Sequence, residues 1–425
     1  MAMPHYATRG RWRKLVSGKL RLIVVCVGLG GLTLIGFYAY AMGTRVSPRM
    51  PHSLPTPYLP STPESLLVKS LLEISNNRLD TALSDIEALL RIKPNFKLAY
   101  LIKGDLLLAR SQAISTIGNA PGAPKENMAD LRDEARARLQ RYMEQPPSGL
   151  IPKYVMQFQP EQKYAIVVDK SKSRLYLYEN QQGEPRYVSD YYITSGKNGA
   201  EKTKEGDQKT PVGVYFVTSE LAKSQLTDFY GPGAFPLNYP NEWDKRLGRA
   251  GHGIWLHGTP SDTYSRPPRA SNGCVVLTNP DLAALSKLLQ VGLTPVIISD
   301  KVEWLDPQAW RAERDTLARQ FEQWRRDWEG RNVDSYLRHY SKSFSGSGQN
   351  LASWASQKRQ VNAAKSWIKV GLSQVSMFRY PGQDNMAVVT FEQDYQSNNL
   401  SNRMRKRQYW VLENKQWKIV YEGAA

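Results

Sequence analysis

The chain is 425 residues long, more than one compact core usually fills, which predicts two or three domains. Hydrophobic residues make up 41% of it and charged residues 23%, with 11 Trp and 23 Tyr, a composition that excludes a largely disordered chain. The formal charge of +18 at pH 7 indicates attraction to polyanions, such as nucleic acid, an envelope polymer or a membrane surface, but the basic residues are scattered and form no recognition motif.

A basic tail and an uncharged stretch open the chain. Residues 1–21 carry six Lys or Arg and no acidic residue, and residues 22–42 carry no charge. The second stretch is long enough to cross a hydrocarbon core as a helix. Because the positive flank stays inside, we expect one pass through the inner membrane, a cytoplasmic N-terminus and a periplasmic body, which disfavours nucleic acid as a partner. A cleaved signal peptide is the alternative.

Two segments follow the expected anchor. Residues 43–62 are rich in Pro and Ser and predict a semi-extended linker. Residues 63–150 place apolar side chains at helical spacing, and within them residues 76–109 resemble one tetratricopeptide unit. One such unit cannot bury its own face, so we expect a helical hairpin and a helix near Ala129–Glu144, packed on the next domain. A groove that binds a protein partner is the alternative interpretation.

The apolar period changes to two between residues 160 and 300, which predicts a mainly-β domain. The strands are expected at 164–170, 173–179, 186–196, 213–219, 253–258 and 294–299. Residues 222–248, rich in Gly, Pro and aromatics, interrupt this pattern and suggest a lid over a site. Its aromatic residues Tyr230, Phe235, Tyr239 and Trp243 are then either walls for a substrate or a local core that holds the loop.

Residues 306–425 begin with a helix and continue with strands. The helix has an apolar face that includes Trp310, Phe321 and Trp324. The segments WEGRNVDSYLRHYSKSF and YWVLENKQWKIVYEG resemble the nuclear-transport-factor-two-like (SnoaL-like) family, which implies an α+β cone-shaped domain. For this domain we expect substrate positioning, dimerisation or a protein partner.

Three motifs in the mainly-β domain stand in a fixed order. They are GDQKTPVGVYFV at 206–217, GIWLHGTP at 253–260 and ASNGCVVL at 270–277. Together they resemble the catalytic domain of L,D-transpeptidases (the YkuD domain), over about residues 163–299. The expected fold class is therefore multidomain: an N-terminal transmembrane helix, a small α-helical region, a mainly-β L,D-transpeptidase domain and a C-terminal α+β domain.

The motifs contain the groups that acyl transfer needs. Cys274 is the lone thiol of the expected periplasmic body and is the candidate nucleophile, with His257 as the general base that removes its proton and holds the thiolate as an ion pair. Gly273 permits a tight turn in which its N–H and that of Cys274 point at one oxyanion. Ser271 orients this loop or bonds near the thiolate, and the carbonyl of Gly258 fixes the imidazole tautomer. A buried structural cysteine is the alternative.

The substrate side of the site departs from the family. Val276 stands where an arginine is common, and Asn272 replaces a frequent histidine or other basic residue. We expect Arg266 or Arg269 to supply the missing charge for a substrate carboxylate, unless both are solvated loop residues. Trp255, on the strand face of His257, is expected to border the site together with Tyr230.

The resemblance implies peptidoglycan tetrapeptide stems as substrate, with Cys274 acylated as the terminal D-Ala leaves. A stem amine as acceptor gives a cross-link, a lipoprotein lysine gives a tether, and water makes the enzyme an L,D-carboxypeptidase that trims tetrapeptides in cell-shape control. A non-catalytic envelope scaffold is the alternative from another class. The few histidines and the single exported cysteine have no zinc-ligand spacing, so neither a metal nor another cofactor is expected.

Overall fold

The computed structural model describes residues 62–114, 116–119, 125–199, 201–383 and 385–425, all of which belong to one compact unit, Pro55–Ala425. The basic tail, the expected membrane helix at 22–42 and nearly all of the Pro-rich linker lie outside these residues. Within the described ranges, no helix is both long enough and apolar enough to cross a membrane.

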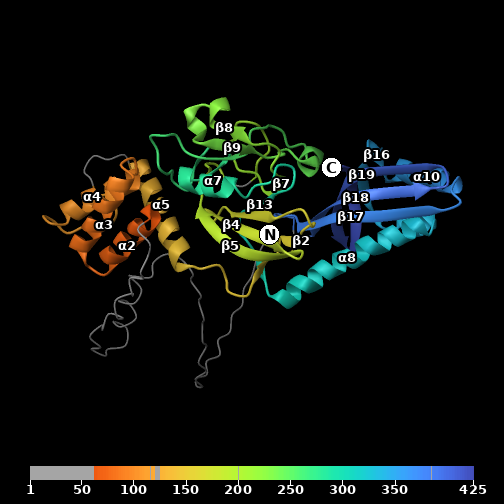
Figure 1. Cartoon of the computed structure of the whole chain (residues 1–425), viewed down its shortest axis with the longest axis horizontal. Coiled ribbons are helices and arrows are strands. Elements are labelled where there is room, and N and C mark those ends of the chain that lie inside the picture. Colours follow the sequence, from red (N-terminus) through yellow and green to blue (C-terminus); the bar gives the residue numbers. More distant parts are fainter. Residues whose placement is uncertain (1–61, 115, 120–124, 200, 384) are drawn as a thin grey trace, which may run out of the picture. The chain divides into compact units, whose positions relative to one another are not determined.

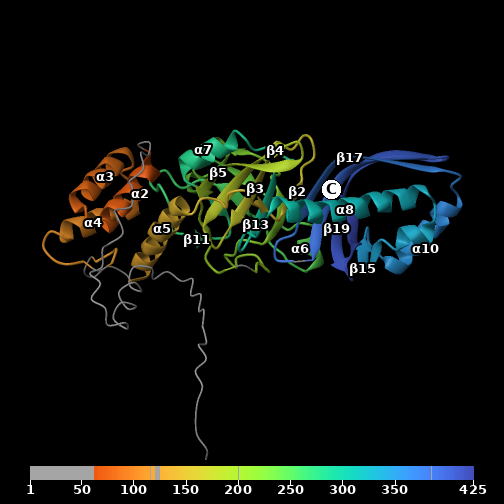
Figure 2. The ribbon, with the colours of Figure 1, turned by 90° about the horizontal axis from the view of Figure 1, so that it is seen from below.

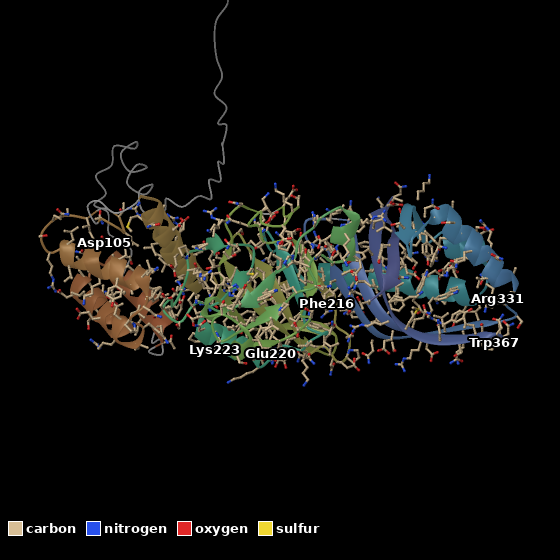
Figure 3. The ribbon with its side chains drawn as sticks, turned by 90° about the horizontal axis from the view of Figure 1, so that it is seen from above. Asp105, Phe216, Glu220, Lys223, Arg331 and Trp367 are labelled. Atoms are coloured by element: carbon tan, nitrogen blue, oxygen red, sulfur yellow. The ribbon has the colours of Figure 1, made fainter. Side chains whose placement is uncertain are left out.

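The described part of the N-terminal region consists of helices α2 (Pro63–Ser75), α3 (Leu79–Ile92), α4 (Lys97–Leu108) and α5 (Lys125–Met143). The hairpin predicted at 76–109 is confirmed as α3 and α4. Leu67 and Ile86 are buried in a core that also contains Tyr264 of the β-rich domain. Asp105 on α4 (Figure 3) accepts a hydrogen bond from the Asn119 N–H at 2.8 Å, which folds the following segment back onto the helix.

Two sheets build the β-rich domain (Figure 1). The larger sheet has the order β5-β4-β3-β13-β7, with β5 (Glu184–Tyr192), β4 (Arg174–Gln181), β3 (Tyr164–Asp169), β13 (Pro295–Ser299) and β7 (Gly213–Phe216). The smaller has the order β12-β10-β9-β8, with β12 (Val275–Val276), β10 (Trp255–His257), β9 (Gly233–Pro236) and β8 (Leu221–Ala222). The pair β6 (Ser195–Gly196) and β11 (Arg269–Ser271) and the helix α7 (Asn279–Ser286) complete the domain.

The prediction of a lid at residues 222–248 is wrong for most of the segment. It contains the 3-10 turns η1 (Lys223–Gln225) and η2 (Asp228–Tyr230), strand β9 and helix α6 (Glu242–Arg246). Phe235 on β9 is paired with Leu256 on β10 and is 2% exposed, because β10 needs β9 as its antiparallel partner. Tyr239 is also buried, and Trp243 stacks on Tyr409 of the C-terminal domain at 5.7 Å.

The C-terminal domain is a curved sheet with helices against it. Its helices are α8 (Pro307–Glu329), α9 (Val333–Leu337) and α10 (Leu351–Ala363), and its strands are β15 (Tyr340–Gly346), β16 (Gln349–Asn350), β17 (Ile368–Arg379), β18 (Met386–Ser397), β19 (Leu400–Glu413) and β20 (Gln416–Ala424). Helix α8 runs along the sheet (Figures 1 and 2), and its predicted apolar face, with Trp310, Phe321 and Trp324, is confirmed as buried. The α+β prediction is therefore confirmed.

The β-rich and C-terminal domains share a core. Strand β2 (Val155–Gln157) joins the C-terminal sheet beside β17, and β1 (Ile151–Pro152) pairs with β14 (Trp304–Leu305). Phe216 at the end of β7 (Figure 3) packs on Phe378 at 6.3 Å between ring centroids. Glu242 on α6 accepts from Arg407 at 2.7 Å and from the Tyr409 hydroxyl at 3.0 Å.

Candidate active site

The two candidate catalytic residues belong to neighbouring strand segments, because β10 and β12 run side by side in parallel. His257 is the last residue of β10 and lies opposite Val276, and Leu256 lies opposite Val275. Cys274 immediately precedes β12 and is in line with Trp255, two residues before His257, so its side chain is expected on the same face of the small sheet as that of His257. Parallel neighbours need a crossover, which here is the chain between the two residues.

A buried hydrogen-bond network shapes the turn before Cys274. The Ser271 hydroxyl accepts from the Gly273 N–H at 3.1 Å and donates to the Cys274 carbonyl at 2.7 Å. Thr210, from the Lys-Thr-Pro turn, donates to the Gly273 carbonyl at 2.9 Å. Gly273 has φ +122°, and a Cβ there would lie 2.9 Å from the Lys209 carbonyl oxygen, so only glycine fits.

This network corrects one expectation about the oxyanion. The Gly273 N–H is already bonded to Ser271, so it is not available beside the Cys274 N–H to hold an oxyanion. The Cys274 N–H, in contrast, donates to no other atom among the described residues. Asn272 is exposed and accepts from the Gln208 amide at 3.3 Å, which places it on the outside of the turn.

The surroundings of Cys274, which is only partly buried, favour the neutral form of its thiol. Its Sγ donates to the Gly253 carbonyl at 3.3 Å. Burial raises the pKa of Cys274 to about 11, while the Trp255 N–H and the charges of Arg266 and Lys202 act in the opposite direction. A thiol with that pKa is almost fully protonated at neutral pH.

His257 is buried and neutral as well. It is 1% exposed, and its Nδ1 lies 2.7 Å from the Gly258 carbonyl, which leaves Nε2 without a proton. Burial lowers the pKa of His257 to about 4, with Arg266 acting in the same direction and the Gly258 carbonyl against it. No hydrogen bond joins His257 to Cys274 among the described residues. The thiolate–imidazolium ion pair expected from the sequence therefore stays a prediction, and burial disfavours both of its charged forms in the resting site.

Asn279 fixes the chain after His257. Its side-chain oxygen accepts from the Thr259 N–H at 2.8 Å, and its amide donates to the Thr259 carbonyl at 3.0 Å. A Cβ on Gly258 would lie 2.2 Å from that same oxygen. Sequence reasoning missed Asn279, because a lone Asn in a Thr-Asn-Pro helix start is indistinguishable from an ordinary cap.

Aromatic rings line one wall of the site. The Tyr230 ring lies 5.1 Å from the His257 ring and 4.8 Å from the Trp255 ring, so Tyr230 borders the base and contacts Trp255 as well. Phe229 lies 5.8 Å from His257 and is 43% exposed. Phe229 was missed, although it neighbours Tyr230 in η2, because one aromatic in an aromatic-rich loop carries no periodic signal.

The two candidate arginines lie in different environments. The guanidinium of Arg266 is half-buried over the Phe229 ring at 4.7 Å, and its charge acts on Cys274. It forms no ion pair with any described residue, and it lines a small cavity together with Val276. Arg269 is exposed and pairs with Asp133 on α5 at 3.3 Å. The expectation that Arg266 or Arg269 binds a substrate carboxylate stays a prediction, and the geometry favours Arg266, which lies beside Val276 and close to Cys274.

Lys202 is a second cation at the site and was not predicted. Its side chain is 3% exposed and donates to Asp207 at 2.7 Å. Asp207 also accepts from the N–H groups of Thr203 and Lys209, and these contacts hold the pKa of its carboxylate down at about 2, against the effect of burial. No three His, Cys, Asp or Glu side chains gather as a metal site within the described ranges.

Comparisons with known proteins identify the same two domains. The family model described as the L,D-transpeptidase catalytic domain (YkuD) matches residues 163–298, and that of the Cds6 C-terminal NTF2-like domain matches residues 316–423. Both resemblances stated from the sequence are thereby confirmed. No curated protein sequence matches the chain.

Two solved structures are similar over most of their own length. Bd1075 of Bdellovibrio bacteriovorus is 30% identical with a TM-score of 0.58, covering 65% of this chain and 98% of that one. The helical cell shape determining protein Pgp2 from Campylobacter jejuni is 27% identical with a TM-score of 0.55, covering 64% of this chain and 95% of that one.

The protonation states of the site predict how Cys274 reacts with iodoacetamide. Because the thiol pKa is raised to about 11, alkylation should accelerate as the pH rises toward that value, with no plateau around neutral pH. His257→Gln should change the rate at neutral pH by no more than about twofold, since the imidazole carries no charge there. Mass spectrometry of the Cys274 peptide separates this reaction from that of Cys26. A neutral-pH plateau that disappears in His257→Gln would instead demonstrate a thiolate–imidazolium pair.

Proposed function

This chain belongs to the L,D-transpeptidase family and carries a C-terminal NTF2-like domain, and from that membership we propose that it acts on peptidoglycan tetrapeptide stems through an acyl-enzyme on Cys274. The observation that carries the proposal is the parallel pairing of β10 with β12, whose register puts Cys274 and His257 on one face of the small sheet. The charge of Arg266, which has no ion-pair partner among the described residues, acts on both. The bond attacked is that between the diamino acid and the terminal D-Ala.

Acylation uses His257 as a general base. Its bare Nε2 takes the thiol proton as Sγ attacks the carbonyl carbon, so that no thiolate has to be stored in the buried site. The bond from the carbonyl carbon to the D-Ala nitrogen then breaks, and the imidazolium returns its proton to the leaving amine. A thioester on Cys274 remains.

Two groups of the protein stabilise the negative charges of the reaction, one for the oxyanion and one for the carboxylate of the stem. The Cys274 N–H, which has no acceptor among the described residues, is the donor for the oxyanion. Arg266, with no acidic partner there, is the cation for the carboxylate of the stem. The rings of Tyr230 and Phe229, with Trp255 packed against Tyr230, cover the base and limit the access of water.

The acceptor decides the product. Attack by an amine of a second stem forms a new amide and returns the proton to Sγ, which is transpeptidation, the function that we favour. Attack by water releases a tripeptide, which is L,D-carboxypeptidase action. The similarity to a protein described as determining helical cell shape supports this second candidate.

We also propose that the chain is anchored in the inner membrane with its catalytic domain in the periplasm. The support is the basic tail at 1–21 and the uncharged stretch at 22–42.

Mass spectrometry of a reaction between the full-length chain and purified disaccharide-tetrapeptide tests the function. Transpeptidation predicts dimers that lack one D-Ala, and carboxypeptidase action predicts tripeptide alone. Cys274→Ala should abolish either product. A complete lack of Cys274-dependent product would contradict the proposal and favour the scaffold interpretation.

Arg266 and Arg269 form a matched pair for the carboxylate. Loss of a charge-assisted hydrogen bond costs about 1.5–3 kcal/mol, so Arg266→Ala should raise KM by about ten- to a hundredfold. Arg269→Ala removes only an exposed pair with Asp133, and its KM should stay within about twofold. Equal KM values in both variants would exclude Arg266 from carboxylate binding.

Protease treatment of intact cells and of spheroplasts tests the anchor. The body should sediment with membranes and be digested only after the outer envelope is opened. A body that is released in soluble form, or that survives protease in spheroplasts, would argue against the proposed topology.

A further inference from the structure

We propose that the helical region sets the position of Arg266, by clamping the loop 259–269, and that Arg138 on α5 is the positioning residue. Residues 259–269 form the Arg266 loop. The inference rests on the proposed function, in which Arg266 binds the carboxylate of the stem. It assigns to the helices a part in substrate binding although they supply no group to the site.

The tip of the Arg266 loop is built into the helical region. Tyr264 is 8% exposed and belongs to the core of the helices, where its ring lies 4.7 Å from that of Phe96. Asn95, between α3 and α4, donates to the Ser261 carbonyl at 3.1 Å. A single helical hairpin cannot bury its own face, and part of the cover that it needs comes from this loop.

Arg138 binds Ser265, the residue that precedes Arg266. Its side chain is 1% exposed, donates to Glu134 at 3.1 Å and pairs with Glu64. It also donates to the Ser265 hydroxyl, which in turn donates to Glu134 at 2.5 Å. Ser265 therefore closes a buried network whose other members belong to α2 and α5.

The same arginine supports the backbone of Arg266 from the other side. Its guanidinium lies over the Tyr192 ring at 4.0 Å. The Tyr192 hydroxyl donates to the Arg266 carbonyl at 2.9 Å, and Thr194 donates to the same oxygen at 3.0 Å. Arg138 thus contacts both the neighbour of Arg266 and the tyrosine that holds its carbonyl.

Energetics favour a role in positioning over a role in stability alone. A buried ion pair gains little over a well-packed apolar contact, because removing its charges from water is expensive. What such a network does provide is a single geometry, since each donor must meet its acceptor. Here that geometry is imposed on the loop whose cation faces the thiol.

Two substitutions, one mild and one that opens a cavity, loosen the clamp without leaving a buried charge unpaired. Ser265→Ala removes the loop's hydroxyl but keeps the pair of Arg138 with Glu134, and Tyr264→Ala removes the ring from the helical core. Tyr100→Ala is the matched control, because Tyr100 lies on α4 with 53% exposure. Ser265→Thr keeps the hydroxyl and serves as the conservative rescue.

The test is a double-mutant cycle on the full-length chain, with kcat and KM for disaccharide-tetrapeptide. Ser265→Ala and Tyr264→Ala should each raise KM by about three- to tenfold with kcat within about twofold, and Ser265→Thr should restore KM. In the Arg266→Ala background neither substitution should change KM further, because both act through the same side chain. An unchanged KM in both variants, or effects that multiply with that of Arg266→Ala, would overturn the proposal.

Hydrogen exchange separates this inference from the proposed function. If the wild-type chain forms no Cys274-dependent product, the function fails, yet the clamp is still measurable in the amides of 259–269. Faster exchange there in Tyr264→Ala but not in Tyr100→Ala would support the clamp. Equal exchange in the two variants would overturn it, whatever the activity.

Discussion

Strands β10 and β12 run parallel, and the hydrogen bonds between them hold His257 beside the strand that Cys274 begins. Parallel neighbours cannot be joined by a tight hairpin, so the chain must leave the sheet and return. That crossover contains the Arg266 loop and ends in the turn made by Ser271 and Gly273. One topological requirement therefore places the base, the cation and the turn before the nucleophile close together on one face of the small sheet.

Burial favours the neutral forms of Cys274 and His257, and the fixed positive charges of Arg266 and Lys202 lie near them. The pKa of Cys274 is raised to about 11 and that of His257 lowered to about 4, which favours the neutral form of each at rest. The charges of Arg266 and Lys202 nevertheless lower the thiol pKa. Every charge that the proposed reaction develops on the substrate side is negative, and cations placed in advance stabilise it without reorganisation.

The long elements and the catalytic motifs could be predicted from the sequence, and the contacts between distant segments could not. Strands β3, β4 and β13 could be predicted because they are short, mostly apolar segments, which the structure buries on both faces. Helix α10 was missed because Trp354 is its one buried residue among those described. The sequence alone does not distinguish Arg266 from Arg269, because both lie in the segment that precedes Cys274. They differ only because the fold brings Asp133, far away in the chain, to Arg269. Phe235 and Phe229 likewise share one loop, and only the pairing of β9 with β10 separates a core residue from a wall.

Both walls of the site are fixed from outside the catalytic domain. The cationic wall is the Arg266 loop, whose Tyr264 lies in the core of the helical region. The aromatic wall is η2, and the segment that contains it continues through β9 to α6, where Glu242 binds Arg407 and Tyr409 of the C-terminal sheet. Neither accessory domain contributes a reacting group, yet each holds one end of a segment that contacts the base or the thiol. In the proposed function, substrate recognition therefore depends on the whole described chain, even though the chemistry uses only groups beside the paired strands β10 and β12.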